Sequence, residues 1–381
     1  MIVTECRRGG LSPSGGRSSL ASALRQMQAR CTECGACLTN CAFLSQHGTP
    51  GSIAARFDFT SQQGRQIAYQ CSLCGLCAAI CPEKLDPGAL FLDIRRRHVE
   101  DGDFESKPYR SILRYEALGG SSLFSLYALP PGCDAVLFPG CALPGIRPAV
   151  TLDMYRQLRR FVPSLGIVLA CCAKPSHDLG RTAHFQTVFG AIRDWLVRHG
   201  IRTVLTACPN CTRVFSQYGE GLAVQTVYQF LDLHGLAKMG TAAADRAVSI
   251  HDPCPGRDDG RTQDAVRNLV TGLGFSLLEL RHCRQLTLCC GEGGMAGCIA
   301  PEFSGQWVDS RRREAGGRML VTSCAGCTAR LNRVTPTVHV LDLLFRPEVL
   351  ARRRLSVPRA PFTYLNRLLL KLRIMSKRLN A

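Results

Sequence analysis

The sequence has no run of about 18 apolar residues, the length that a membrane-spanning helix requires, so we expect no transmembrane segment. Its first ten residues lack the apolar stretch of a secretory signal peptide, which predicts a cytoplasmic protein. The sequence also lacks a phosphate-binding loop, a strand–Gly-x-Gly-x2-Gly–helix fingerprint and a Ser-His-Asp arrangement. It therefore predicts no flavin or nicotinamide site in this chain, so any flavin belongs to another subunit.

Aromatic residues and acidic residues are both scarce. Aromatics make up 7% of the 381 residues, and 47 Lys and Arg face 29 Asp and Glu, which gives a formal charge of +18. Proteins that bind single-stranded nucleic acid interleave basic with aromatic side chains, and this pattern is missing here. We therefore expect an anionic membrane surface or an acidic protein as partner, and no nucleic acid.

Cysteine is abundant, and 18 of the 22 cysteines fall into four ordered groups. The first two groups share the spacing Cys-x2-Cys-x2-Cys-x3-Cys. In two-cluster ferredoxins, three cysteines of such a run bind one cubane, and the fourth binds the partner cluster. We therefore predict two [4Fe–4S] cubanes: site 1 on Cys31, Cys34, Cys37 and Cys81, and site 2 on Cys71, Cys74, Cys77 and Cys41.

Disulfides and zinc are the alternatives for these eight cysteines. Disulfide scaffolds belong to short secreted domains, and this spacing packs thiols too densely for ordinary pairing. A zinc finger needs only four ligands and gives no reason for eight at this spacing. We expect reduced, iron-loaded cysteines, with Gly35 and Gly75 at the turns of the two loops.

The other two groups each contain five cysteines and repeat at offsets of 113 to 118 residues, which predicts a duplication. We call them site 3 (Cys141, Cys171, Cys172, Cys208 and Cys211) and site 4 (Cys254, Cys289, Cys290, Cys324 and Cys327). Short apolar runs end on several of these cysteines. They predict buried strands of α/β units whose carboxyl ends present the ligands.

These motifs resemble the cysteine-rich family of heterodisulfide reductases. Related proteins are the iron–sulfur subunits of glycolate oxidase, anaerobic glycerol-3-phosphate dehydrogenase and lactate-utilisation complexes. Cys289-Cys290-Gly291 and Cys324-Ala325-Gly326-Cys327 match the family signature, whereas Cys171-Cys172-Ala173 lacks its glycine. The resemblance implies a further [4Fe–4S] cluster of non-cubane type at each of sites 3 and 4. Zinc in one repeat is the alternative.

The sequence thus predicts an α+β/α/β protein with a helical two-[4Fe–4S] ferredoxin-like domain, followed by a duplicated α/β cysteine-rich domain. The expected parts are a flexible segment 1–28, a ferredoxin-like domain 29–118, repeats at 133–245 and 246–345, and a basic amphipathic tail 346–381. A helix from about 362 to 380 would place its leucines on one face, which is typical of a helix lying on anionic lipid. Packing on its own domain is the alternative.

The expected function is that of an iron–sulfur subunit of an oxidoreductase. It would pass electrons from a flavoprotein dehydrogenase to a quinone or membrane cytochrome, at the cytoplasmic face of the membrane. One alternative is that this chain reduces a disulfide itself at site 3 or site 4, and another is a redox sensor that binds nucleic acid. No catalytic residue is assigned. His177, His184, His251 and His282 lie near cysteines and are candidates to tune a cluster.

Overall fold

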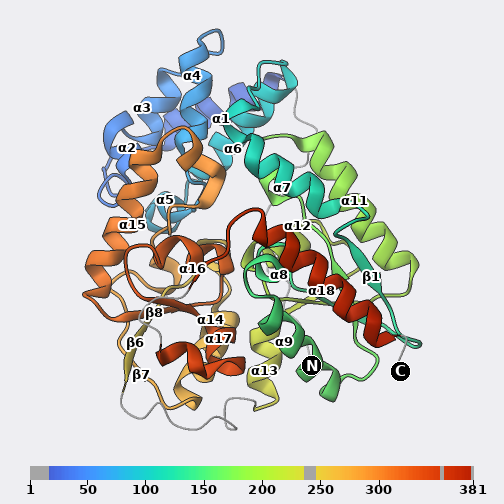
Figure 1. Ribbon diagram of the computed structural model, residues 1–381. Helices are drawn as coiled ribbons and strands as arrows, with labels where there is room; N and C mark the ends of the chain where they lie inside the picture. Colours follow the sequence, from blue (N-terminus) through green and yellow to red (C-terminus); the bar gives the residue numbers. More distant parts are fainter. Residues whose placement is uncertain (1–16, 236–245, 352–355, 379–381) are drawn as a thin grey trace, which may run out of the picture.

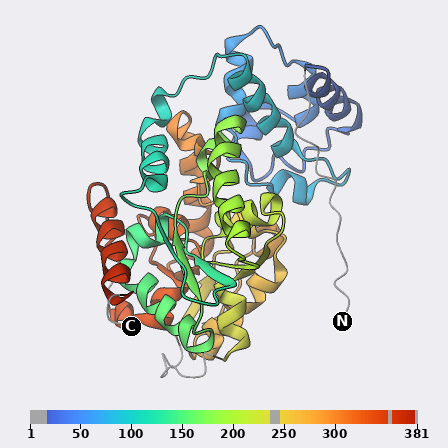
Figure 2. The same ribbon diagram turned by 90° about the vertical axis from the view of Figure 1, so that its right-hand side faces the viewer.

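The computed structural model describes residues 17–235, 246–351 and 356–378. These residues form a helical N-terminal part that lies on two α/β units, with a long C-terminal helix along the outside (Figure 1). Figure 2 shows the same division from the side. None of the helices in the described ranges is long and apolar enough to cross a membrane.

The N-terminal part consists of helices and of the cysteine loops of sites 1 and 2. They are α1 Arg17–Arg30, α2 Ala42–His47, α3 Pro50–Ala55, α4 Gln62–Ile67, α5 Leu76–Ile80, α6 Pro87–Glu100 and α7 Arg110–Gly120. Helix α6 begins at Pro87 because Asp86 caps it, its side chain accepting a hydrogen bond from Ala89 N. The helix directs Leu90, Phe91 and Ile94 into the core.

The expected flexible lead-in is helical from Arg17 onward, while residues 1–16 lie outside the described residues. Helix α1 buries Leu20, Leu24 and Met27, which share one helix face, in the same core as α6. The Gly- and Ser-rich composition of the lead-in did not reveal this apolar stripe because the stripe starts only at its end.

The first α/β unit has a five-stranded sheet with the order β1-β3-β2-β4-β5. Strand β1 is antiparallel to β3, and the other neighbours are parallel. The strands are β1 Leu126–Ala128, β2 Ala135–Phe138, β3 Gly166–Leu169, β4 Thr203–Thr206 and β5 Ala223–Thr226. The helices are α8 Ala142–Ile146, α9 Pro148–Phe161, α10 Lys174–Asp178, α11 Thr182–Arg198, α12 Pro209–Tyr218 and α13 Val227–Leu233. Strand β1 joins this sheet although it precedes residue 133, where we expected the first repeat to begin.

The second unit has a four-stranded, all-parallel sheet with the order β7-β6-β8-β9. Its strands are β6 Ala247–Ile250, β7 Ser276–Leu277, β8 Met319–Thr322 and β9 Thr337–His339. Its helices are α14 Gly260–Gly272, α15 Pro301–Ala315, α16 Ala325–Leu331 and α17 Val340–Phe345. If the strands of each unit are numbered along the chain from β2 and from β6, both sheets have the order 2-1-3-4. Both units therefore place these four strands in the same way.

The two units pack reciprocally through their last helices. Helix α13 of the first unit contacts α14 of the second, and α17 of the second contacts α9 of the first. Both α13 and α17 begin with a capping box, formed by Thr226 with Gln229 and by His339 with Asp342. Asp342 also accepts hydrogen bonds from Arg147 of the first unit at 2.9 and 3.0 Å. This exchange joins the two units through one continuous apolar core.

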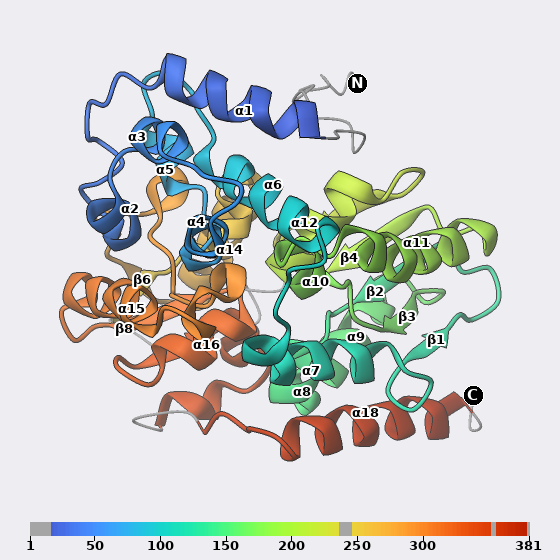
Figure 3. The same cartoon turned by 90° about the horizontal axis from the view of Figure 1, so that it is seen from above.

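Helix α18, Phe362–Arg378, lies along the edge of the molecule beside α8 (Figure 3). Its buried face consists of Arg367, Leu370 and Ile374. The apolar stripe that the sequence suggested for a membrane faces solvent, with Leu365, Leu369, Leu372 and Met375 each 41 to 51% exposed. The helix therefore packs on its own domain and still presents an apolar face.

Candidate metal centres

The two ferredoxin-like loops follow the same backbone path. Glu33 and Leu73 adopt left-handed conformations at equivalent positions, and so do Gly35 and Gly75, both at φ 73°. Glycine is favoured at such positions because it lacks a Cβ atom. The expectation that these two glycines turn the loops is thus met by the backbone, which brings three cysteines of each loop around one point.

The structure brings Cys81 beside the first cysteine loop and Cys41 beside the second. The four cysteines of site 1 line one cavity, which the Cys77 side chain of site 2 also reaches. Burial raises the pKa of Cys37 to about 11, with smaller contributions from Cys31, Cys34 and Cys81. Burial likewise raises the pKa of Cys41 to about 12, and Cys71 adds to this shift.

Site 3 gathers its cysteines at the carboxyl ends of β3 and β4 and just after β2. The Sγ atoms of Cys141 and Cys171 are 3.9 Å apart, and those of Cys172 and Cys211 are 3.5 Å apart. Cys208 and Cys211 are hydrogen-bonded to each other. A hydrogen bond from Cys171, together with the charge of Arg367, lowers the pKa of Cys141 to about 7.

Site 4 brings its five cysteines into one continuous chain of contacts. Cys289 is hydrogen-bonded to Cys254 and Cys290. These bonds, first of all the one with Cys254, lower the pKa of Cys289 well below its usual value. The Sγ atoms of Cys290 and Cys327 are 3.2 Å apart, and Cys324 is hydrogen-bonded to Cys327.

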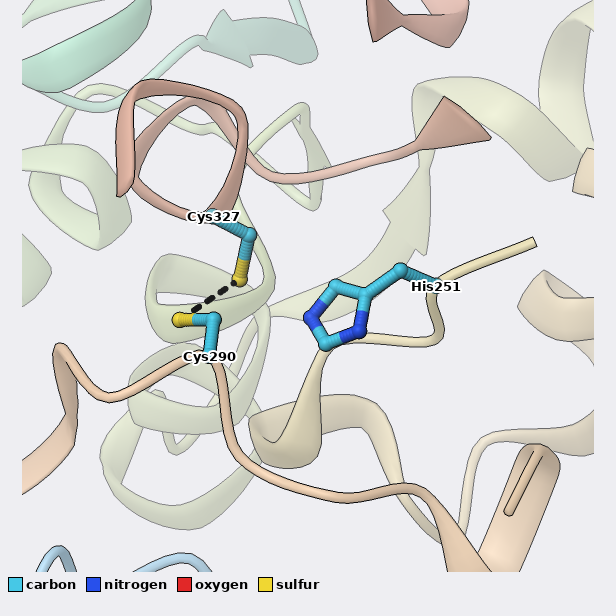
Figure 4. A group of neighbouring side chains, drawn as sticks. All are labelled: His251, Cys290 and Cys327. Atoms are coloured by element: carbon cyan, nitrogen blue, oxygen red, sulfur yellow. Dashed lines mark hydrogen bonds between the residues drawn. The ribbon is translucent and has the colours of Figure 1, made fainter. Parts of the chain in front are cut away.

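His251 completes site 4 in the position that Figure 4 shows, with its imidazole facing Cys290 and Cys327. The ligand atoms of these three residues lie within 4.8 Å of one another. His251 is 1% exposed, and neither ring nitrogen has a hydrogen-bond partner among the described residues. Burial lowers the pKa of His251 well below its usual value, so the ring is neutral. A neutral unpartnered imidazole beside thiols fits a metal-binding site.

The other histidines near cysteines have partners of their own. His177 hydrogen-bonds Asp178 and Tyr218 at 2.8 and 2.9 Å. His184 lies 3.4 Å from Glu116, and His282 pairs with Glu314. These contacts explain the three histidines as parts of the protein framework.

The residue after each adjacent cysteine pair has the same unusual conformation. Gly291 has φ 83° and Ala173 has φ 55°, so both are left-handed. The missing glycine of the first repeat therefore leaves the loop geometry unchanged, at a cost of about 1–2 kcal/mol for an alanine in this region.

The four sites are neighbours. Cys74 of site 2 packs in one apolar cluster with Cys289 and Cys254 of site 4. Tyr228 is buried between sites 4 and 3: its hydroxyl lies 2.8 Å from the carbonyl oxygen of Ala207 and 2.9 Å from that of Ser323. Each of these residues directly precedes a cysteine, Cys208 in site 3 and Cys324 in site 4.

The set of thiols fits iron–sulfur clusters better than disulfides. No disulfide links the cysteines within the described ranges, and thiolate sulfur is the ligand that these clusters require. Sequence reasoning missed several residues that contact the cysteine loops, among them Arg95, Arg257, Arg367 and Tyr228. No motif marks them, since each reaches its loop from a distant part of the chain.

Comparison with known proteins agrees with this geometry. Residues 30–86 match the model of a 4Fe-4S dicluster domain, and residues 248–332 match that of a cysteine-rich domain. The match to the cysteine-rich domain thus contains all five cysteines of site 4 and ends before β9, while the dicluster match contains the eight cysteines of sites 1 and 2.

Three curated relatives are similar to most of this chain. A fumarate reductase (CoM/CoB) subunit of Methanothermobacter marburgensis is 24% identical, over 78% of this chain and 66% of that protein. A probable membrane-anchored ferredoxin of Chromohalobacter salexigens is 26% identical, over 75% and 48%. A dihydromethanophenazine:CoB–CoM heterodisulfide reductase subunit of Methanosarcina mazei is 23% identical, over 79% and 87%. The chain thus spans about two thirds of the first of these proteins and about half of the second.

Proposed function

We propose that this chain is an electron-transfer subunit of an oxidoreductase complex, with [4Fe–4S] cubanes at sites 1 and 2 and non-cubane clusters at sites 3 and 4. The observation that carries the proposal is the contact between site 2 and site 4 through Cys74 and Cys289. This contact joins the dicluster domain to the cysteine-rich domain. Fumarate reductase, heterodisulfide reductase and an EtfAB:quinone oxidoreductase among the relatives support an oxidoreductase.

Each bound cluster would supply one-electron transfer. The residues of the chain order the sites as 1, 2, 4 and 3: Cys77 extends to the cavity of site 1, Cys74 contacts Cys289, and Tyr228 lies between the loops of sites 4 and 3. Sites 3 and 4 also belong to units with matching strand order, which supports the proposed duplication.

The test is anaerobic purification followed by iron analysis and electron paramagnetic resonance. Four filled sites correspond to about sixteen irons per chain. Cys74→Ser should remove the signal of site 2, whereas Cys133→Ser, outside the four sets, should leave the iron content unchanged. A folded protein without iron would contradict the proposal.

The donor and acceptor are tested separately. The proposed donor is a flavoprotein dehydrogenase and the proposed acceptor is a quinone or a membrane cytochrome. We expect a co-purifying flavoprotein to reduce the clusters with its own substrate, and a water-soluble quinone to reoxidise them. If a flavoprotein binds but does not reduce the clusters in single-turnover mixing, it is not the electron donor of this chain.

Disulfide reduction by this chain is the second candidate, favoured by the unpartnered imidazole of His251 beside Cys290 and Cys327. Burial opposes it, because Cys289, Cys290, Cys324 and Cys327 are 0 to 4% exposed and a substrate disulfide must reach the site. The assay is thiol release from added disulfide by dithionite-reduced protein. If the protein turns over the disulfide and His251→Ala abolishes this activity, disulfide reduction becomes the proposed function in place of electron transfer.

The exposed stripe of α18 is proposed to lie on an anionic membrane at the cytoplasmic face. Leu365, Leu369 and Leu372 form it with the exposed Arg373 beside them, which is the pattern of an interfacial helix. Binding to vesicles with phosphatidylserine should exceed binding to neutral vesicles and fall with Leu369→Glu. Leu233→Glu, at another exposed leucine, is the matched control. Equal binding of all variants would contradict this placement.

A further inference from the structure

Five arginine side chains within the described ranges are buried, and they fall into two kinds. Arg267 and Arg311 form salt bridges with carboxylates. Arg95, Arg257 and Arg367 have no carboxylate partner among the described residues, and each lies beside a cysteine loop. A buried charge without a counter-charge is strongly unfavourable. The three unpaired cations therefore indicate that negative charge belongs at the cysteine sites.

Arg95 of α6 is fully buried and holds the loop of site 2. It donates hydrogen bonds to the carbonyl oxygens of Cys71 at 2.5 Å, Asp178 at 2.7 Å and Gly294 at 2.9 Å. The Asp178 carboxylate is engaged by Lys174 and His177 and does not pair with this guanidinium. Arg95 thus ties the site 2 loop to both α/β units.

Arg257 approaches the same loop from the second unit. Its Nε and Nη2 atoms donate to the carbonyl oxygen of Cys74 at 3.3 and 3.1 Å, and Nη2 donates to that of Thr287 at 2.7 Å. Two guanidinium groups therefore contact two successive cysteines of one site. Asp86 places a negative charge near Cys71 and Cys77, but its side chain caps α6 and is exposed to solvent.

Site 1 has the opposite electrostatic surroundings. Glu33 and Glu83 line its cavity, and no lysine or arginine does so among the described residues. The nearby Arg30 is exposed and donates to the carbonyl oxygen of Glu83. Two sites with the same ligands and the same loop conformation thus differ in fixed charge.

We propose that Arg95 and Arg257 give site 2 a higher reduction potential than site 1, so that electrons enter at site 1 and leave through site 2 toward Cys289. The inference rests on the proposed function. Reduction adds one electron and one negative charge to a site and breaks no bond, and a fixed cation in a dry environment stabilises that charge. Arg95 and Arg257 act as positioning residues, since they reach the site through the backbone of its ligands.

The test is a redox titration of the anaerobically prepared protein, followed by electron paramagnetic resonance at each potential. We expect site 2 to be reduced before site 1. Arg257→Met and Arg95→Met should each lower the equilibrium constant for reducing site 2 at least tenfold, or about 59 mV for one electron. Arg147→Met, which breaks the buried pair with Asp342 in another region, should leave the potential of site 2 unchanged.

A complementary variant does not depend on a buried residue. Glu33 is exposed, and Glu33→Gln should raise the potential of site 1 toward that of site 2 without affecting the fold. Reduction of site 1 before site 2 in the unmodified protein would overturn the inference, as would unchanged potentials in Arg257→Met and Glu33→Gln. Absence of the cluster signals would instead contradict the proposed function itself.

Discussion

The hydroxyl of Tyr228 allows a sharp test of how sites 3 and 4 are joined. A phenol carries one proton, yet this hydroxyl lies 2.8 and 2.9 Å from two carbonyl oxygens, those of Ala207 and Ser323. Tyr228 is buried, so water cannot replace the lost donor when the hydroxyl is removed. We expect Tyr228→Phe to lower the free energy of unfolding by about 1–3 kcal/mol, the cost of leaving a buried acceptor unsatisfied.

Tyr155→Phe is the matched control. Its hydroxyl is also buried and donates to one carbonyl oxygen, that of Leu165, at 3.0 Å. Removing this bond again leaves a buried acceptor unsatisfied, so it should also cost about 1–3 kcal/mol, but it should not affect the cysteine loops. Urea denaturation of both iron-free variants measures these costs.

The decisive readout for Tyr228→Phe is iron release under a chelator challenge, followed by electron paramagnetic resonance. Because the one hydroxyl proton of Tyr228 is shared by the loops that carry Cys208 and Cys324, both site 3 and site 4 should lose iron faster than in the unmodified protein. Sites 1 and 2 should behave as in Tyr155→Phe. Faster loss at only one of the two sites, or equal loss in both variants, would refute the reasoning.

Three further predictions concern individual residues in or near the cysteine loops. Ala173→Gly should raise the free energy of unfolding by about 1 kcal/mol because it relieves a left-handed alanine. Gly291→Ala should lower the free energy of unfolding, because the added Cβ would collide with the carbonyl oxygen of Ser304. Urea denaturation measures both changes, and equal effects of the two variants would contradict this reasoning. The iron-free protein should lose stability as the pH rises from about 9, where unfolded thiols titrate, through about 11 to 12, since folding raises the pKa values of Cys37 and Cys41. Thermal unfolding at pH 7.5 and 10.5 should show no such loss in the iron-loaded protein. Arg367→Met should stabilise the iron-free protein because it removes an unpaired buried cation, and it should destabilise the iron-loaded protein. Stability changes of the same sign in both forms would argue against the idea that the loaded site 3 balances the charge of Arg367.

The loop conformation at sites 1 and 2 could be predicted because it is local. Three cysteines at i, i+3 and i+6 and a glycine between them determine one tight loop, which the structure repeats at Gly35 and Gly75. The placement of sites 3 and 4 at strand ends was also predictable. Strand β4, Thr203–Thr206, and strand β8, Met319–Thr322, are apolar runs that end just before a cysteine pair.

The electrostatic surroundings of the sites could not be predicted from the sequence. Arg95 contacts a carbonyl 199 residues away in the chain, and Arg257 contacts one 183 residues away. Nothing in the local sequence distinguishes these arginines from exposed ones, because their burial depends on how three parts of the fold meet. His251 was a weak candidate by sequence, since only the folded chain shows that its ring lacks a hydrogen-bond partner among the described residues.

The periodicity of α18 predicted an amphipathic helix correctly but could not identify its covered face. Arg367 is buried because its guanidinium lies over the rings of Tyr115 and Phe124 and donates to Gly119 O at 3.0 Å. The leucine stripe is left on the outside as a result. An amphipathic pattern indicates that two faces of a helix differ, whereas tertiary contacts decide which of them packs.

Helix α18 therefore has two proposed roles, contact with site 3 and binding to a membrane, and a deletion of the helix could not separate them. Arg367 faces site 3 while Leu369 faces solvent, so removing the helix would expose the site and abolish the surface at once. Point variants separate the roles. Arg367→Met should change the potential of site 3 and leave vesicle binding intact, and Leu369→Glu should do the reverse. In the double variant the two effects should add, because one side chain is buried and the other faces solvent. A change in the site 3 potential caused by Leu369→Glu alone would show that the exposed stripe belongs to the site, and the membrane placement would then lose its independent support.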